Sequence, residues 1–404
     1  MTIIADEEYR GSRQPYRLEN DDLVVDPRFT SIFVENLASG EGFVLIDQVS
    51  RDDPAVDEEQ ASDKSQETRL TLDRIRISIR VYANEGALGG IRITPSITEN
   101  TFRVVVDNRE EIWTLRNTIA LFNQPLVEIT VHIPTLVDHM EKMTVVTQNQ
   151  EIDIDNLEGI LFTDSFHATS TNGKISAKHL RGVNISLNTT SGELVIPGII
   201  SAGSSLSVKT VSGKMEIHQQ PDRCNGSTSS TVHLETTSGS IRGEYIAREK
   251  LTAKSVNGLL DFCLKAPDSG ERPSVQVSSI SGSMKGKLTI GKIFEANTTG
   301  GSVNFTLDNG GETVMKASSI SGNVELSLLN QFKGKFKLSS ITGKTTVTTP
   351  NEDNLKWEKS NRNYKQGFKE DASVAENDEE VKELDKSSVS VTSTSGNIAL
   401  NFEG

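Results

Sequence analysis

The sequence has 404 residues, a formal net charge of −14 and only 5% aromatic residues. The acidic balance argues against nucleic acid as a partner and against an anionic membrane surface, because both attract clustered Lys and Arg. The length exceeds that of a usual single globular domain, so it indicates either two domains or one long repeat array.

The sequence indicates neither a targeting segment nor a disulfide framework. Residues 1–8 have no basic stretch followed by an apolar one, which a signal peptide requires, and no run of about 18 apolar residues predicts a membrane span. The two cysteines, Cys224 and Cys263, are too few for a disulfide framework. These features predict a cytoplasmic protein, with the nucleus as a second location, that has neither a membrane nor a nucleic-acid partner.

The first third of the chain predicts a tail followed by a small β-rich region. Residues 1–22 are polar and charged, which predicts a disordered acidic tail. Residues 23–140 predict the β-rich region, with a mobile acidic loop at residues 50–69 and a segment, Glu110–Phe122, that fits either a short helix or a strand. Alternating apolar and polar residues predict its strands at Ser31–Glu35, Phe43–Asp47, Leu70–Tyr82, Gly90–Ile93, Thr101–Val106 and Val127–Ile133.

One unit of sequence then recurs through residues 141–404 and is clearest in Leu206–Ile217. Apolar residues alternate with polar ones up to a turn rich in Ser and Thr, a glycine follows, and the alternation resumes. Successive glycines are 19, 21, 26, 19, 24, 19, 21, 21 and 53 residues apart, so the basic period is about 20. These glycines are Gly173, Gly192, Gly213, Gly239, Gly258, Gly282, Gly301, Gly322, Gly343 and Gly396.

The residues around the glycine also repeat in kind. Seven positions before it all ten residues are apolar, three before it all are Ser or Thr, and two before it all are Thr, Val or Ile. Met143–Ile154 fits the same columns with Gln150 in the glycine position, so it is predicted to be a degenerate first unit. Alternation on both sides of a corner predicts two short strands per unit, and neighbouring units must stack to bury their inner faces.

The sequence therefore predicts an all-β protein. It is expected to be a single-stranded β-solenoid, similar to a parallel β-helix, with coils of about 20 residues over residues 141–404 and an insertion at residues 351–386. Glycine is expected at each corner because it adopts φ > 0 without a clash. On this reasoning Gly282→Val should be strongly destabilising and Gly40→Val mild.

The C-terminal end of the solenoid is expected to need a cover. The last predicted coil, Val389–Phe402, would otherwise leave backbone groups unpaired at an open edge. The insertion, the N-terminal tail or a second copy of the chain could cover it, so self-association through this end is one expectation. The insertion is the first choice, although a plain disordered loop or a partner-binding segment also fits it. Its apolar anchors are Leu355, Trp357, Tyr364 and Phe368.

The corners also carry a resemblance to a known family. Six of them contain Ser/Thr-x-Ser-Gly, at Thr189–Leu194, Thr210–Met215, Thr236–Ile241, Ser279–Met284, Ser319–Val324 and Ser393–Ile398. With the lead-in Val127–Pro134, these corners resemble the putative-adhesin family of uncharacterised β-solenoid proteins, especially its fungal-type members. The likeness covers roughly residues 127–404. It implies a β-solenoid fold and a role in adhesion, and it brings no set of catalytic or binding residues.

The sequence predicts no catalytic, cofactor-binding or metal-binding residues. No nucleotide-binding or hydrolase motif is present, and the histidines form no ligand pair at metal-binding spacing. They are His132, His139, His167, His179, His218 and His233. Three positions after the glycine, outward residues alternate in sign, which indicates neutralisation between stacked strands rather than catalysis. They are Glu216, Arg242, Asp261 and Lys285.

Three functions remain open. The leading hypothesis is a non-enzymatic intracellular β-solenoid that acts as a binding or scaffolding surface for unidentified protein partners. The second is a cell-surface adhesin, which glycosylation of Asn188 or Asn297 would support. The third is a carbohydrate-active enzyme on a β-helix, which would need acidic residues lining a groove across adjacent coils.

Overall fold

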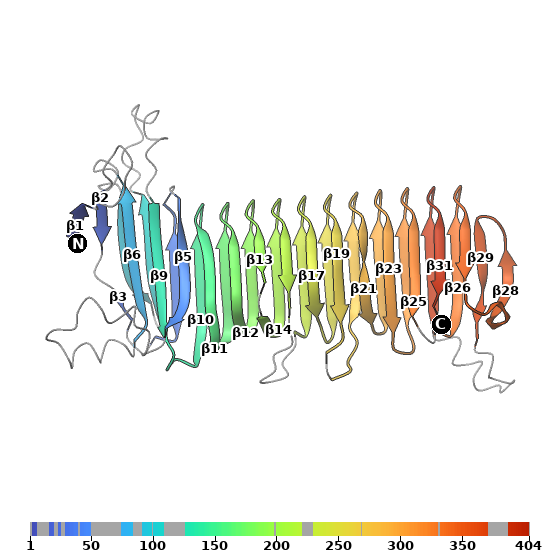
Figure 1. Cartoon of the computed structure of the whole chain (residues 1–404), viewed down its shortest axis with the longest axis horizontal. Coiled ribbons are helices and arrows are strands. Elements are labelled where there is room, and N and C mark those ends of the chain that lie inside the picture. Colours follow the sequence, from blue (N-terminus) through green and yellow to red (C-terminus); the bar gives the residue numbers. More distant parts are fainter. Residues whose placement is uncertain are drawn as a thin grey trace, which may run out of the picture. The chain divides into compact units, whose positions relative to one another are not determined.

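A computed structural model describes most of the chain. The described residues are 2–5, 16–19, 23–25, 29–38, 41–49, 74–83, 91–98, 100–108, 126–197, 199–219, 229–267, 269–329, 332–370 and 387–403. They hold strands and a short 3-10 segment, so the prediction of an all-β solenoid is confirmed (Figure 1). Two compact units, Met1–Ala202 and Gly203–Gly404, are described separately below.

Unit 1 is built from long parallel strands and shorter antiparallel ones. Its strands are β1 (Thr2–Ala5), β2 (Tyr16–Glu19), β3 (Leu23–Val24), β4 (Ser31–Asn36), β5 (Gly42–Val49), β6 (Arg76–Ala83), β7 (Ile91–Thr98), β8 (Thr101–Asn108), β9 (Leu126–Pro134), β10 (His139–Thr147), β11 (Glu151–Ser170), β12 (Ile175–Thr189) and β13 (Leu194–Ile196). The predicted loop at residues 50–69 and the segment at 110–122 lie outside the described residues.

The coils of unit 1 begin earlier than the sequence predicted. β4 pairs in parallel with both β8 and β10, and β5 pairs in parallel with both β9 and β11. The buried residues Ile32 and Val34 lie opposite Met143 and Val145, so they belong to the same columns. Parallel pairing of the coil type therefore begins before the boundary predicted at residue 140. It was missed because the chain between β5 and β8 interrupts the 20-residue period on which the repeats were aligned.

Antiparallel strands flank the outermost coil of unit 1. β6 pairs with β9, and β7 pairs with β8. β2 in turn pairs with β6 and β1 with β2, so two strands lie inside residues 1–22, where disorder was expected. β7 pairs with no other described strand and contains Pro95, a residue that sheets tolerate at their edges.

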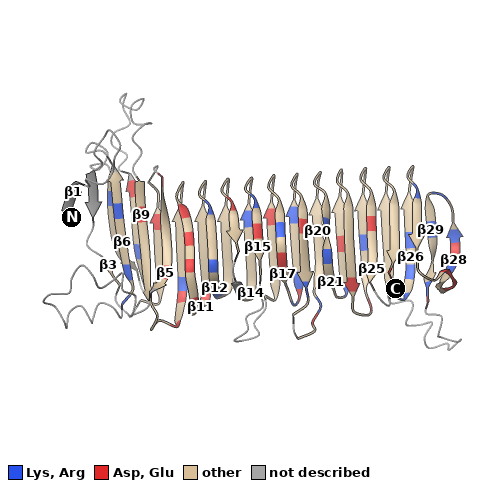
Figure 2. Cartoon of the chain, viewed as in Figure 1, with Lys and Arg blue, Asp and Glu red and all other residues tan. Residues whose placement is uncertain are grey.

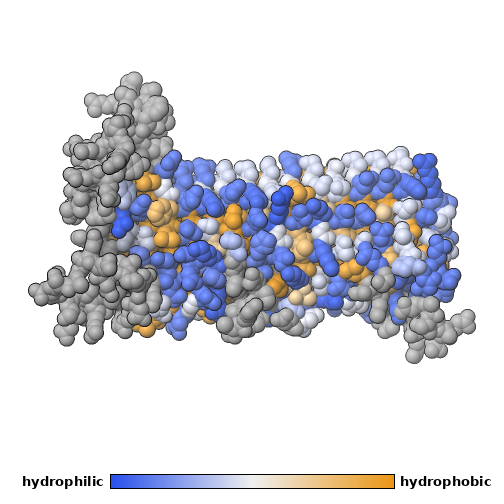
Figure 3. All heavy atoms as spheres, in the orientation of Figure 1, coloured by the Kyte–Doolittle hydropathy of each residue, from blue (hydrophilic) through white to orange (hydrophobic). Residues whose placement is uncertain are grey.

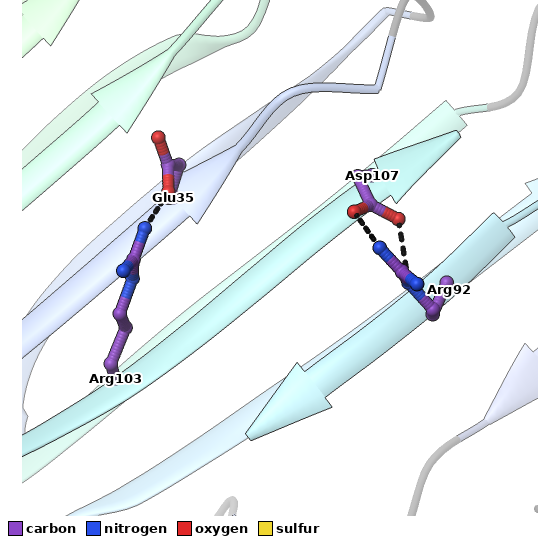
Figure 4. A network of polar contacts seen from close by, with 4 residues as sticks. All are labelled: Glu35, Arg92, Arg103 and Asp107. Atoms are coloured by element: carbon purple, nitrogen blue, oxygen red, sulfur yellow. Dashed lines mark hydrogen bonds and ion pairs between the residues drawn. The ribbon is translucent and has the colours of Figure 1, made fainter. Parts of the chain in front are cut away.

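Ion pairs tie the exposed faces of these strands together (Figure 4). Arg92 on β7 donates two hydrogen bonds to Asp107 on β8, of 3.2 and 2.8 Å. Arg103 on β8 donates one of 2.7 Å to Glu35 on β4 and lies 4.8 Å above the ring of Phe33. The pKa of Arg92 is raised, first by its hydrogen bond to Asp107 and then by that residue's charge. Both arginines are about half exposed to solvent, so the pairs add register rather than much stability.

Unit 2 consists of strand pairs joined by tight corners. Its strands are β14 (Ile199–Thr210), β15 (Met215–His218), β16 (Thr231–Thr236), β17 (Ile241–Ile246), β18 (Lys250–Ser255), β19 (Leu260–Lys265), β20 (Ser274–Ser279), β21 (Met284–Ile290), β22 (Ile293–Thr298), β23 (Val303–Asn309), β24 (Val314–Ser319), β25 (Val324–Leu329), β26 (Gly334–Ser340), β27 (Thr345–Thr348), β28 (Leu355–Ser360), β29 (Tyr364–Lys369), β30 (Ser388–Ser393) and β31 (Ile398–Phe402).

The coils of unit 2 stack in parallel and in register. Leu206 lies opposite Val232, which lies opposite Leu251, and the other apolar positions follow the same pattern. These side chains are 0–1% exposed and form the interior columns that the alternation predicted. Burying each of them contributes roughly 1.5–3 kcal/mol before the conformational entropy is subtracted.

The last coil in the sequence is not the last coil in space. β30 pairs in parallel with β24 on one side and with β26 on the other, and β31 lies likewise between β25 and β27. The coil β30–β31 is therefore inserted between two coils that precede it in the chain. The expectation that Val389–Phe402 forms an open end is wrong, because both of its strands are paired on both sides.

The predicted insertion instead covers the outermost coil. Residues 352–354 form a 3-10 turn, and β28 and β29 form an antiparallel hairpin whose strand β29 pairs with β26. Trp357 packs edge-on against Phe336 at 5.4 Å between ring centroids, and the Lys369 ammonium donates to the Phe332 carbonyl. The insertion is thus a cap rather than wholly mobile, although residues 371–386 lie outside the described residues.

The corner glycines are required by close stacking and not by their own backbone angles. The glycines with positive φ lie elsewhere, for example Gly243 and Gly286 inside strands. At the corners the problem is the neighbouring coil: a Cβ on Gly282 would lie 1.9 Å from the Gly258 carbonyl oxygen, and one on Gly301 would lie 2.0 Å from that of Gly282. The position was predicted correctly and the reason given for it was wrong.

The Ser or Thr three positions before each glycine closes the corner. Its hydroxyl oxygen accepts a hydrogen bond from the glycine N–H, at 2.8 Å between Ser319 and Gly322. In the same corner the Ser319 hydroxyl donates to the Gly301 carbonyl of the neighbouring coil, at 3.2 Å. One side chain therefore satisfies two backbone groups, which explains why no other residue type occurs there.

We expect Ser319→Ala to lower the free energy of unfolding by about 1–3 kcal/mol, because it leaves the Gly322 N–H without its partner. Ser319→Thr should be nearly neutral, since Thr already fills this position at Thr298 and its hydroxyl accepts from the Gly301 N–H. Ser318→Ala, one residue away on the exposed face, is the control. Urea unfolding of the three variants measures the difference, and equal midpoints for Ser319→Ala and Ser318→Ala would contradict the role of the hydroxyl.

Candidate interaction surface

The predicted column of alternating charges is present. Some of its members pair with the neighbouring coil, and one pairs within its own coil. Register places Arg242 opposite both Glu216 and Asp261, and Lys285 opposite Asp261. Lys285 forms an ion pair of 3.1 Å with Asp261. Glu216 instead pairs with Lys214 of its own coil, whose hydrogen bond and charge lower the pKa of the Glu216 carboxyl. A general acid needs the opposite shift, so the surroundings of the Glu216 carboxyl do not favour that role.

The histidines are spread along the chain. His132 lies 3.0 Å from Asp47 and His233 lies 3.2 Å from Glu235, whereas the His167 ring contacts the Thr169 hydroxyl at 2.8 Å. The pKa of His167 is lowered, mainly by burial and then by the charge of Lys142. Within the described residues no three His, Cys, Asp or Glu side chains gather in a way that could hold a metal ion. Cys224 lies outside that part of the chain.

A column of exposed β-branched residues runs along the corners of unit 2. It occupies the position two before each glycine and is called the corner ridge here. In spatial order its members are Val211, Thr237, Val256, Ile280, Thr299, Ile320, Thr394 and Ile341. Four of its five aliphatic members are among the most exposed large apolar residues described: Val211 is 47%, Ile280 54%, Ile320 55% and Ile341 70% exposed. The fifth, Val256, is half-buried.

The backbone of the corner explains why these side chains point outward. The N–H of Gly300 donates to the Ile280 carbonyl at 2.7 Å, and the N–H of Ser395 donates to the Ile320 carbonyl at 2.9 Å. Each corner is thereby bonded to the next, about 4.8 Å away. The interior is already filled by the flanking columns, so the ridge side chains remain in solvent.

The repeated residue type of the corner ridge is visible in the sequence, but its exposure to solvent is not. All ten units carry Thr, Val or Ile at this position, which indicates a structural constraint without saying on which side the residue lies. The inserted coil also changes the order, because Thr394 comes between Ile320 and Ile341. Elsewhere the surface is mostly polar, with apolar residues in separate patches on the face shown in Figure 3.

Among the described residues no helix is long and apolar enough to cross a bilayer.

Comparisons with known proteins identify a family. A family model described as Toastrack DUF4097 matches residues 92–292 and again residues 204–401. The two matches overlap, as expected when one repeat can be aligned in more than one position. No curated protein matches the sequence significantly.

Two solved structures also match, at low similarity. One is described as a putative cell adhesion protein from Clostridium sporogenes ATCC 15579, with 7% identity, a TM-score of 0.18, and coverage of 96% of this chain and 100% of that chain. The other is described as a putative adhesin from Bacteroides fragilis NCTC 9343, with 11% identity, a TM-score of 0.23, and coverage of 95% and 96% respectively. No residue of either structure is mapped onto this chain.

Proposed function

The chain belongs to the Toastrack DUF4097 family, and on that premise we propose that it is a non-enzymatic β-solenoid that binds or scaffolds partner proteins through the corner ridge. The observation that carries the proposal is the repeated exposure of aliphatic side chains, up to 70% at Ile341, on a rigid and regularly spaced edge. Single exposed aliphatic residues are common on protein surfaces, whereas a line of them is typical of interaction sites.

The chain itself offers the variant that tests this proposal. Thr fills the ridge position in other coils, for example Thr237 and Thr299. The triple variant Ile280→Thr/Ile320→Thr/Ile341→Thr should therefore fold normally while losing most of the apolar ridge surface. We expect partners that co-purify with the wild-type protein from its native cell to be lost from this variant, with an unchanged melting temperature.

The matched control changes outward-facing residues that lie outside the corner ridge. Gln276→Thr/Ser318→Thr/Thr392→Ser changes three outward-facing residues of the strands before the corners and leaves the ridge intact. Partners should be retained by this control. If the ridge variant and the control retain the same partners, the ridge is not the binding surface.

We further propose a cytoplasmic location, with the nucleus as a second site. The low cysteine content supports this location. The cell-surface alternative, which includes the fungal-type adhesin assignment, predicts glycosylation at exposed Asn297, so mass spectrometry of the native protein distinguishes the two. The enzymatic alternative predicts turnover on a glycan panel that Asp261→Asn or Glu216→Gln abolishes, and we expect none.

A further inference from the structure

The outermost strand of the C-terminal hairpin, β28, is an open sheet edge. It pairs antiparallel with β29 and with no other strand in the part of the chain that the structure describes. The outer side of such a strand leaves N–H and C=O groups able to bond a further extended segment.

One side of this edge is rich in lysine. Residues 332–370 contain 9 Lys and Arg against 4 Asp and Glu, whereas the whole chain has 42 against 56. Exposed lysines on β26 and β28 (Figure 2) lie on either side of Phe368 and Gln366 of β29 and define what is called here the terminal lysine face: Lys335, Lys337, Lys356 and Lys359. One carboxylate lies among them, because Glu358 of β28 accepts a hydrogen bond from the Gln366 amide.

Aromatic rings and one carboxylate hold these ammonium groups in place. The Lys335 Nζ lies 5.4 Å from the ring centroid of Phe368, and the Lys359 Nζ lies 5.0 Å from that of Tyr364. Lys356 forms an ion pair with Glu370. The lysines are therefore positioned on the sheet before any partner arrives, which reduces the entropy lost on binding.

The opposite side of the same strand is aromatic. Trp357 is 43% exposed, packs edge-on against Phe336, and has the Lys365 Nζ 4.8 Å from its ring centroid. The directly paired position on β29 is Gly367, which has no side chain, and the β29 side chain that reaches the indole is Lys365. Exposed Trp is enriched at binding sites because it supplies a large apolar contact.

We propose that β28 is a docking edge for an extended segment of a partner protein in which acidic residues alternate with apolar ones. Successive side chains of a strand point to opposite faces of the sheet. A register shift in β28 between Trp357 and Lys359 brings Lys356 and Lys359 to the same face, opposite Phe368 and Gln366. The acidic residues of such a segment would lie beside these two lysines, and its apolar residues would lie beside Trp357. Directly opposed charges of unlike sign on neighbouring strands stabilise the pairing.

Protection of the edge does not account for all of these residues. Lysine on an edge strand deters aggregation, but Lys335 and Lys337 lie on β26, which is paired on both sides and has no edge to protect. Exposed Trp357 on the edge strand also works against protection. In an antiparallel pair of β28 strands, the register that opposes Lys356 to Lys359 is disfavoured by their like charge, so a second copy of this chain would need the register that opposes Lys356 to Glu358.

The test uses the full-length protein and labelled eight-residue peptides in fluorescence anisotropy. The probe is a peptide of alternating Glu and Val, and its control has the same charge but Pro at two central positions, which removes backbone donors. The protein variant is Lys356→Glu/Lys359→Glu, and its control is Lys254→Glu on an exposed strand position of another coil. We expect the alternating peptide to bind and the charge reversal to weaken it by about tenfold or more.

The remaining arms separate strand addition from simple charge attraction. The Pro peptide should not bind, Lys254→Glu should bind as the wild type does, and the amides of β28 should gain protection from hydrogen exchange when the alternating peptide is added. Equal binding of the Pro peptide would overturn the proposal in favour of unspecific attraction to an anion. No binding of the alternating peptide at millimolar concentration would also overturn it. Either result leaves the ridge proposal unaffected, because the ridge lies on other residues.

Discussion

Gly282→Val is expected to lower the stability of the protein by about 3 kcal/mol or more. The reason is steric: the new Cβ would lie 1.9 Å from the carbonyl oxygen of Gly258 and 2.8 Å from the Ser279 hydroxyl. The backbone of one coil would have to move away from the next, which also weakens the hydrogen bonds of both neighbouring strands. Urea unfolding and the melting temperature measure the loss.

The matched control for this prediction lies in the next corner. Gly300 precedes the corner glycine Gly301, and the nearest atom to a Cβ on Gly300 is 3.8 Å away. Ser321 fills the equivalent position one corner further on, so Gly300→Ser should be neutral or slightly stabilising. Gly40, the comparison that the sequence suggested, lies outside the described residues. Similar losses for Gly282→Val and Gly300→Ser would show that contact between corners does not restrict the residue type.

Removing the C-terminal cap is expected to make the protein self-associate. Replacing residues 351–386 with a Gly/Ser linker would leave the outer edge of β26 unpaired and uncover Phe336, which now contacts Trp357. A parallel sheet edge next to an exposed apolar interior favours edge-to-edge pairing. We expect light scattering to show oligomers or aggregates, together with a lower melting temperature.

A point variant distinguishes the cap from a simple spacer. A Cβ on Gly367 would lie 2.4 Å from the Lys356 carbonyl oxygen and 3.0 Å from Phe336 Cζ. Gly367→Val should therefore loosen the hairpin without shortening the chain, and should produce a weaker form of the same self-association. The control replaces residues 220–228 with a Gly/Ser linker of equal length and should remain monomeric. A monomeric deletion variant with an unchanged melting temperature would refute the capping role.

The two ends of the chain follow one principle that the sequence did not reveal. In unit 1 the first coil, β4–β5, lies between β8–β9 and β10–β11, and antiparallel strands cover the outer coil. In unit 2 the last coil, β30–β31, lies between β24–β25 and β26–β27, and an antiparallel hairpin covers the outer coil. In unit 2 the chain passes one position in the stack and fills it later, whereas in unit 1 the first coil receives a neighbour on one side and then on the other. In both units the segment that connects these coils forms the cover.

The sequence by itself determined the coil. Alternation over Leu206–Ile217 specifies which side chains face inward, and the Ser or Thr and the glycine specify the corner, because these effects act over a few neighbouring residues. The predicted columns are buried as expected, from Leu206 to Leu400. The sequence also contains no catalytic or nucleotide-binding motif, so it predicts a functional surface and not a catalytic centre.

Only the tertiary structure decided the order of the coils, the identity of the outermost one and the exposure of the corner ridge. Gly322 and Gly343 are 21 residues apart, and so are Gly301 and Gly322. The coil β30–β31 nevertheless lies between the coils of Gly322 and Gly343. The coils of Gly301 and Gly322, in contrast, pair directly with each other. Because every coil presents the same apolar columns, Val391 fits beside Ala317 as well as beside Leu338. Because the columns are interchangeable, the local sequence does not determine which strands lie side by side. Long-range pairing and the length of the connecting segments determine this order.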